Sequence, residues 1–263
     1  MPRRLVFGAL FAVVFAAGAL AYGLVSQPVG AHDFFHNSFP NCEGLPTAAQ
    51  LRNHLVAAPA LAAPPIGGTV GGLFNGTRMW AAVVNRAGEL CAYNTSTTDK
   101  TQVWPGSQAI AKSKAYTANA FSLDDLALST AQLYTFTQPG HSLWSLGQSN
   151  LFDASSLQPP IGPKSDVGDI VGGLIFFGGG VPLYDKTGKL VGGLGISGDT
   201  SCADHEIAKR VRHLANLNPP GGPVADDISY SSADGASAFT HPLCIKTFRN
   251  GVSLGNEAPA VGY

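Results

Sequence analysis

Two short segments hold glycine at a density that few strands tolerate, and they restrict what kind of sheet this chain can build. FFGGGVPLY occupies residues 176–184 and GGLGISGD occupies residues 192–199, with a Lys-Thr-Gly turn between them. Glycine inside a strand is tolerated where another backbone or a ligand comes close. The two segments are therefore expected to pair as a hairpin with a flat surface bare of side chains. That surface suits a tightly packed helix or a planar ligand, and both remain open.

Three near-matches to catalytic motifs fail in their details. GLGISG at 193–198 has the spacing of a dinucleotide-binding loop, but it lies inside a strand and no second strand ends in an acid about 20 residues later. GISGD around Ser197 has Asp199 where a nucleophile elbow needs glycine. HEIAK ends in Lys209, which is no zinc ligand. The sequence thus favours a binding protein over a classical enzyme.

Charge and composition exclude some classes of partner. The 263 residues contain 16 basic and 17 acidic side chains, for a formal net charge of -1. A nucleic-acid-binding surface needs clustered positive charge, so no nucleic-acid partner is expected. Only 13% of residues are charged, while 32 are glycine and 18 are proline. This composition predicts a loop-rich globule and not a helical bundle.

The N-terminus is typical of an exported protein. MPRR precedes an unbroken apolar run at 5–25, and the small residues of VGA at 29–31 suit cleavage after Ala31. The run, at about 20 residues, is also long enough to remain as a membrane anchor. Residues 1–31 are therefore expected to be a signal peptide or an N-terminal anchor. The remainder is expected in the periplasm or at the cell surface, with a membrane contact only if the segment is retained.

Four cysteines in an oxidising compartment predict two disulfides. Of the three possible connectivities we favour Cys42–Cys91 and Cys202–Cys244, because each ties a proline-rich terminal segment to a regular element. The alternative is a reactive thiol at Cys202, where a helix N-terminus lowers a thiol pKa.

The order of regular segments predicts an α+β domain with an antiparallel sheet and flanking helices. Beyond residue 218 the chain is rich in proline, glycine and serine, so residues 219–263 are expected to form an irregular tail held by Cys244. Four helices are expected, at 45–60, at 105–122, from Ser122 to about Phe136 and at 202–216. Thr47 is the expected N-cap of the first helix and Ser107 that of the second. Hairpins are expected at 78–94 and 181–197.

Several of these segments together resemble one known family. VVNRAGELCAY, AIAKSKAYTANAFS and GGGVPLYDKTGKLVGGLGISGDTSCADHEIA are similar, in this order, to the signature of the GlcG/HbpS-like haem-binding family. That family also supplies the C-terminal domain of PduO-type adenosyltransferases. The resemblance covers about residues 45–216 and implies a profilin-like domain over 32–218. Asn85 replaces the family's usual aspartate, and an insertion follows the first hairpin.

The resemblance also implies a ligand and a site. It implies haem, or a related tetrapyrrole or iron species, and assembly into homo-oligomers. The lysine is expected to pair with a propionate, the threonine to offer its hydroxyl, and the glycines to let the macrocycle approach the strand. The positions carried over from the family are Lys114, Thr117, Gly179, Gly180 and Pro182.

Two further residues are candidates for the same site. Phe121, one turn beyond Thr117, is placed to pack on the ring edge, and His141 is an outside candidate for an axial ligand. The function expected from this site is storage of haem, haem sensing or protection against haem.

Two alternative functions come from other classes. Cleavage after Ala31 would make His32 the N-terminal residue, and its amine with the imidazoles of His32 and His36 would suit Cu(II) in a copper-binding or oxidative protein. The other alternative is a structural module that binds no ligand and packs its sheet against a partner.

Overall fold

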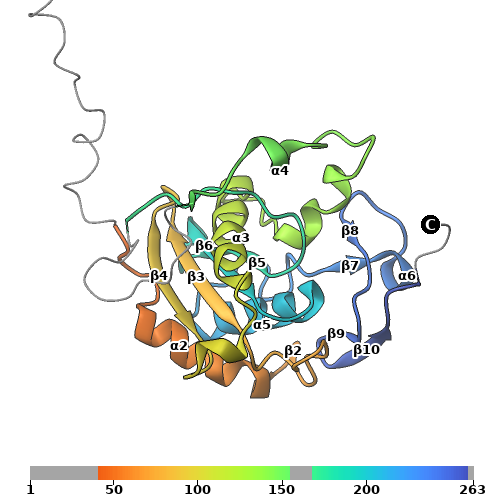
Figure 1. Cartoon of the computed structure of the whole chain (residues 1–263), viewed down its shortest axis with the longest axis horizontal. Coiled ribbons are helices and arrows are strands. Elements are labelled where there is room, and N and C mark those ends of the chain that lie inside the picture. The colour runs from red at the N-terminus through yellow and green to blue at the C-terminus, as the bar shows by residue number, and fades with distance from the viewer. Residues whose placement is uncertain (1–40, 155–167, 260–263) are drawn as a thin grey trace, which may run out of the picture. The chain divides into compact units, whose positions relative to one another are not determined.

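A four-stranded antiparallel sheet lies at the centre of the computed structural model, which describes residues 41–154 and 168–259 (Figure 1). The chain divides into Met1–Phe39 and Pro40–Tyr263, and all described residues belong to the second unit. The strand order is β4-β3-β6-β5, so the two predicted hairpins are confirmed and pair side by side. The strands are β3 Trp80–Asn85, β4 Leu90–Thr95, β5 Gly180–Tyr184 and β6 Leu190–Ser197.

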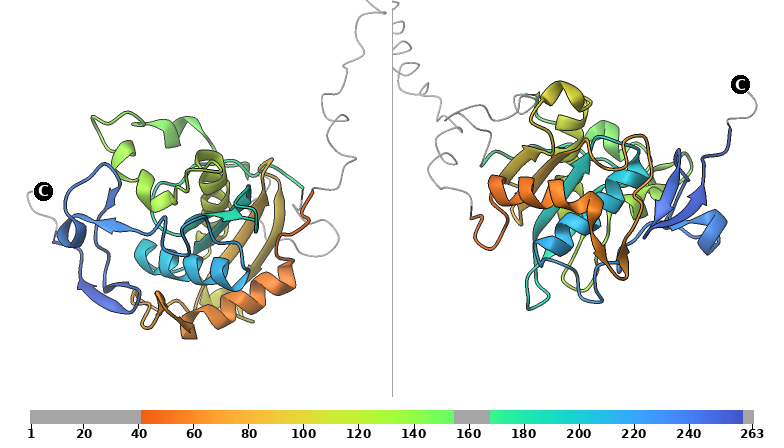
Figure 2. Two further views of the ribbon diagram at one scale, coloured as in Figure 1. Left: turned by 180° about the vertical axis from the view of Figure 1, so that it is seen from behind. Right: turned by 90° about the horizontal axis from the view of Figure 1, so that it is seen from below.

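Helices cover both faces of this sheet (Figures 1 and 2). Helix α3 (Ser107–Phe121) packs on one face, where its alanines meet the alternate strand residues Trp80, Ala82 and Val84. Helices α2 (Ala48–Ala57) and α5 (Ser201–Leu214) share a second hydrophobic core with the opposite face. The α+β class with flanking helices is therefore confirmed.

The ends of the helices follow from local capping. Thr47 forms the predicted cap of α2, in a reciprocal capping box with Gln50. Thr200 caps α5 by accepting a hydrogen bond from the Ala203 amide. Helix α3 begins one residue away from the expectation, because Gly106 is its N-cap and Ser107 its first residue.

The predicted helix from Ser122 to Phe136 is wrong. Ser122 has an extended backbone, and its hydroxyl bonds to both the amide and the carbonyl of Leu128, which closes a loop instead of a helical turn. Only short 3-10 turns follow, η3 (Thr130–Leu133) and η4 (Thr135–Thr137). One short helix, α4 (Leu146–Ser149), lies in the described residues between η4 and β5.

The C-terminal segment is more regular than predicted. It contains a parallel strand pair, β7 with β8, a short helix α6 between them, and an antiparallel hairpin, β9 with β10. Residues 58–67 add a small hairpin of their own, β1 with β2. The bounds are η1 Ala58–Ala60, β1 Ala62–Ala63, β2 Ile66–Gly67, η2 Lys100–Gln102, β7 Ser229–Tyr230, α6 Ser231–Asp234, β8 Thr240–His241, β9 Thr247–Arg249 and β10 Val252–Gly255.

Both predicted disulfides are present. Cys42 is bonded to Cys91, and Cys202 is bonded to Cys244, so no described cysteine is free. The alternative of a reactive Cys202 thiol is therefore wrong for this oxidised form. Within residues 41–154 and 168–259, no helix has the length and apolar character needed to cross a bilayer. The predicted signal or anchor segment lies outside the described residues.

Candidate functional site

The glycines of β6 lie directly beneath helix α3. A β-carbon on Gly195 would collide with the carbonyl of Ala111 and lie 2.5 Å from the amide nitrogen of Ala115. One on Gly193 would collide with the Ala115 carbonyl. These two glycines therefore allow the helix backbone to rest on the strand. Of the two uses left open by the sequence, close helix packing is the one seen at β6.

The residues carried over from the family come together where α3 meets the segment 174–182. Thr117 is fully buried, donates its hydroxyl hydrogen to the Ser113 carbonyl at 2.7 Å and accepts from the Ile175 amide at 3.0 Å. Pro182 is buried on β5, and its carbonyl accepts from Arg212 at 3.2 Å. The hydroxyl of Thr117 is thus already used to hold segment 174–182 against the helix.

Lys114 is fully buried and forms an ion pair. Its Nζ lies 2.7 Å from Asp204 Oδ2, donates to the Ile196 carbonyl at 3.1 Å and sits 4.9 Å from the centre of the Phe177 ring. Burial lowers the pKa of Lys114 and raises the pKa of Asp204 to about 6, and each partner opposes the shift of the other. The ammonium joins α3 to α5 and is not directed at solvent.

Protein atoms lie close against the expected glycines in this arrangement. A β-carbon on Gly179 would lie 2.5 Å from the Ile196 carbonyl oxygen and 2.7 Å from Lys114 Nζ. One on Gly180 would lie 2.6 Å from the Lys114 carbonyl oxygen and would collide with Thr130. Protein atoms therefore fill the surface that a planar ligand would need. The ligand-lining role of these residues stays a prediction.

The remaining predicted residues are placed differently. Phe121 is half-buried at the end of α3 and meets the edge of Phe176, with ring centroids 6.2 Å apart. His141 is exposed in the loop before α4. The copper candidates His32 and His36 lie outside the described residues.

An open groove of about 450 Å³ lies between the loop 69–78 and the C-terminal segment. It combines apolar and cationic side chains. Leu73 is 56% exposed and Phe74 is 36% exposed, which is high for large apolar side chains. The Arg78 guanidinium lies 4.6 Å from the centre of the Phe74 ring. Lys246 and Phe248 complete the opposite wall.

Asp199 gives the groove its shape. Its carboxylate accepts hydrogen bonds from the Leu73 amide at 2.6 Å and the Phe74 amide at 2.8 Å. It also accepts from the Thr200 amide at 2.7 Å at the start of α5. In the sequence, this aspartate was informative only because it rules out a nucleophile elbow at Ser197. Its position in a glycine-rich turn could have predicted this role, because backbone amides in such turns often point toward an anion.

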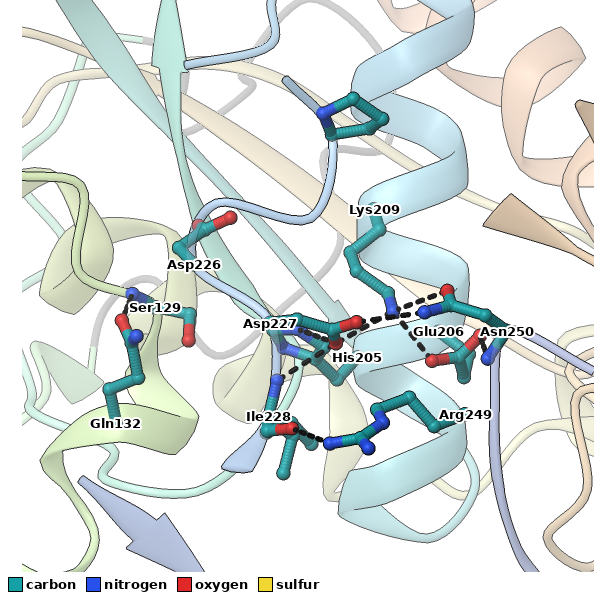
Figure 3. A network of polar contacts seen from close by, with 12 residues as sticks. Ser129, Gln132, His205, Glu206, Lys209, Asp226, Asp227, Ile228, Arg249 and Asn250 are labelled. Carbon is teal, nitrogen blue, oxygen red and sulfur yellow. Dashed lines mark hydrogen bonds and ion pairs between the residues drawn. The ribbon is translucent and has the colours of Figure 1, made fainter. Parts of the chain in front are cut away.

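The outer face of α5 carries a buried network of charges (Figure 3). Lys209 Nζ lies 2.7 Å from Glu206, 2.7 Å from Asp227 and 3.0 Å from the side chain of Asn250. Burial alone would raise the pKa of Asp227, but Lys209 and His205 outweigh it and hold that pKa well below its usual range. The network attaches the C-terminal segment to the helix, which is a structural role.

Comparison with known proteins assigns the chain to a family. The model of a family described as "Haem degrading protein HbpS-like" matches residues 73–212, more than half of the sequence. A solved structure described as a PduOC:heme complex is 22% identical, covers 65% of this chain and 92% of its own, and has a TM-score of 0.44. No curated protein matches.

Two other solved structures have similar sequence identity and coverage, with lower TM-scores. Protein ORFY of Klebsiella pneumoniae is 20% identical, with 64% of this chain and 88% of that chain covered and a TM-score of 0.41. HbpS is 22% identical, with coverage of 63% and 86% and a TM-score of 0.36. The matched segment 73–212 contains α3, both strands of the glycine-rich hairpin and most of α5. The chain belongs to the HbpS-like family.

Proposed function

We propose that this protein is exported and binds haem for storage, sensing or protection, as a homo-oligomer. The observation that carries the proposal is the family match over residues 73–212, because it contains the helix and hairpin on which the resemblance rests. The apolar segment at 5–25 supports export. His32 and His36, the residues of the copper alternative, lie outside the matched segment, and the comparisons give copper no support.

We place the haem in the groove beside loop 69–78, since the α3–hairpin contact is filled. Haem is a flat apolar ring with two carboxylates, and the groove offers an apolar wall beside two cations. Phe74 and Phe248 are available to the ring, while Arg78 and Lys246 are available to the propionates. The Asp199 hydrogen bonds hold the loop in place before any ligand arrives, which reduces the ordering cost of binding.

Haemin titration followed by the Soret band tests both parts of the proposal. The chain beginning at residue 32 should bind haemin at micromolar concentration. The double variant Arg78→Gln/Lys246→Gln should bind about 10-fold more weakly, since each exposed ion pair contributes up to about 1 kcal/mol. Lys186→Gln/Lys189→Gln removes the same charge from an exposed turn and serves as the matched control.

The outcomes separate the function from its location. No haemin binding by the wild type would refute the proposed function. Binding that is equally strong in both double variants would keep the function and refute the groove. Following the Soret band after addition of a reductant in air distinguishes storage, with the band retained, from degradation, with the band lost. Gel filtration with light scattering of the same sample measures the oligomeric state.

A further inference from the structure

Three buried side chains with metal-binding atoms meet at the start of helix α5. Cys202 is the second residue of that helix, while His241 ends β8 and Cys244 follows shortly after it. One imidazole nitrogen and the two sulfurs all lie within 4.8 Å of one another. The residues are 1%, 3% and 8% exposed, respectively. None of them takes part in the proposed haem groove.

The histidine is oriented as a metal ligand would be. Its Nδ1 lies 2.7 Å from the carbonyl oxygen of Pro242, which can only accept, so Nδ1 carries the hydrogen. Nε2 is then unprotonated and accepts a long hydrogen bond of 3.3 Å from the Gly178 amide. Metal-bound histidines commonly donate their other ring nitrogen to a backbone carbonyl in this way.

Two hydrogen-bond donors lie beside Cys244 Sγ, whereas Cys202 Sγ lies 3.8 Å from the Pro242 carbonyl oxygen. The backbone amide of Cys202 donates to Cys244 Sγ at 3.2 Å, and the Ser201 hydroxyl lies 3.3 Å from the same sulfur. The hydroxyl of Thr247 donates to the Cys244 carbonyl at 2.9 Å and lies 3.9 Å from Cys202 Sγ. A helix N-terminus with such donors stabilises negative charge on sulfur. A disulfide carries no such charge, whereas a pair of thiolates does.

We propose that reduction of the Cys202–Cys244 disulfide creates a Cys₂His site for Zn²⁺. A thiol or phosphine reductant supplies two electrons to the S–S bond, and each sulfur takes up a proton. Zn²⁺ then displaces both thiol protons and binds the two thiolates and His241 Nε2. The Ser201 hydroxyl, 3.4 Å from Nε2, or a water takes the fourth position of the tetrahedron. Two thiolates and an imidazole are ligands that favour zinc over hard cations.

The other disulfide in the chain is an internal control. Among the described residues, the grouping of three metal-binding side chains occurs at Cys202–Cys244 and not at Cys42–Cys91. Reduction of both disulfides therefore exposes one complete site and one pair of thiols without a third ligand.

The experiment uses Co²⁺, a spectroscopic substitute for Zn²⁺, on the chain beginning at residue 32. The phosphine-reduced protein should bind one Co²⁺ with the thiolate charge-transfer bands and visible bands of a tetrahedral site, and the oxidised protein should bind none. Cys42→Ser/Cys91→Ser should retain the spectrum and Cys202→Ser/Cys244→Ser should lose it. His241→Gln should weaken binding by at least about 10-fold.

Several results would overturn the proposal. These are no tetrahedral cobalt spectrum in the reduced wild type, equal affinity in His241→Gln, or a spectrum that survives Cys202→Ser/Cys244→Ser. Reduction with Co²⁺ already present covers the case in which the metal-free reduced chain unfolds. The far-ultraviolet circular dichroism should then stay native, and loss of it in the presence of metal would also reject the site.

Discussion

Gly195→Ala tests whether the β6 glycines exist to seat helix α3. The added β-carbon would lie 2.5 Å from the Ala115 amide nitrogen, whereas carbon makes favourable contacts at about 3.5 Å or more. The helix would have to retreat by about 1 Å, which would open the contacts of Ala111 and Ala115 with Trp80 on the sheet. Overpacking of a core costs about 1–3 kcal/mol, and the upper end is expected because backbone atoms cannot rotate away.

The assay is thermal unfolding followed by circular dichroism. A loss of about 3 kcal/mol should lower the thermal midpoint by about 6–12 °C in a domain of this size. Gly106→Ala is the matched control, because its backbone has an ordinary φ of -61° and the nearest atoms to its β-carbon are those of the Trp104 ring at 3.5 Å. If Gly195→Ala is as stable as the control, the close approach of α3 to β6 is refuted.

Two further predictions concern buried charge. Lys114→Met should destabilise the fold by about 3–5 kcal/mol in chemical unfolding, because it leaves the Asp204 carboxylate buried without its cation. The double variant Lys114→Met/Asp204→Leu should recover part of the loss, and no recovery would contradict the reasoning. Burial lowers the pKa of His241 from 6.5 to about 4, so from pH 6.5 down to 4 the unfolded chain takes up a proton that the folded chain refuses. Stability relative to His241→Gln should fall over that window by up to about 3 kcal/mol, and parallel pH profiles of unfolding free energy would refute the assignment.

Local signals predicted most of the elements. The apolar run around Val83 with the turn after it, and Thr47 ahead of Leu and Ala at helical spacing, were enough to predict the first hairpin and the first cap. The segment after Ser122 was predicted as a helix because a serine followed by acids resembles an N-cap. Its hydroxyl instead closes a loop on Leu128, a choice decided by packing that no local pattern reveals.

The candidate site was predictable in part for a different reason. Motif resemblance brought Lys114, Thr117 and Gly180 to one place, where the structure also has them. It could not show that Asp204, 90 residues along the chain from Lys114, would form an ion pair with the lysine. The groove depends on Lys246 and Phe248, which lie in the segment predicted to be an irregular tail. Contacts between residues so far apart in the sequence produce no periodic pattern of residue types.

The buried ion pairs between α5 and the C-terminal segment make that segment part of the folded domain. Arg212 is fully buried beneath Asp226, at 2.6 Å, and Lys209 beneath Asp227, at 2.7 Å. If the segment detached, Arg212 would lose its carboxylate partner and Lys209 would keep only Glu206 of its two, so the segment cannot fray as a free terminus does. The cooperative unit of folding therefore extends well past residue 212, where the family match ends. A protease cut in this segment would act like a mutation in the core, and a fragment ending at the family boundary would be a poor substitute for the whole domain.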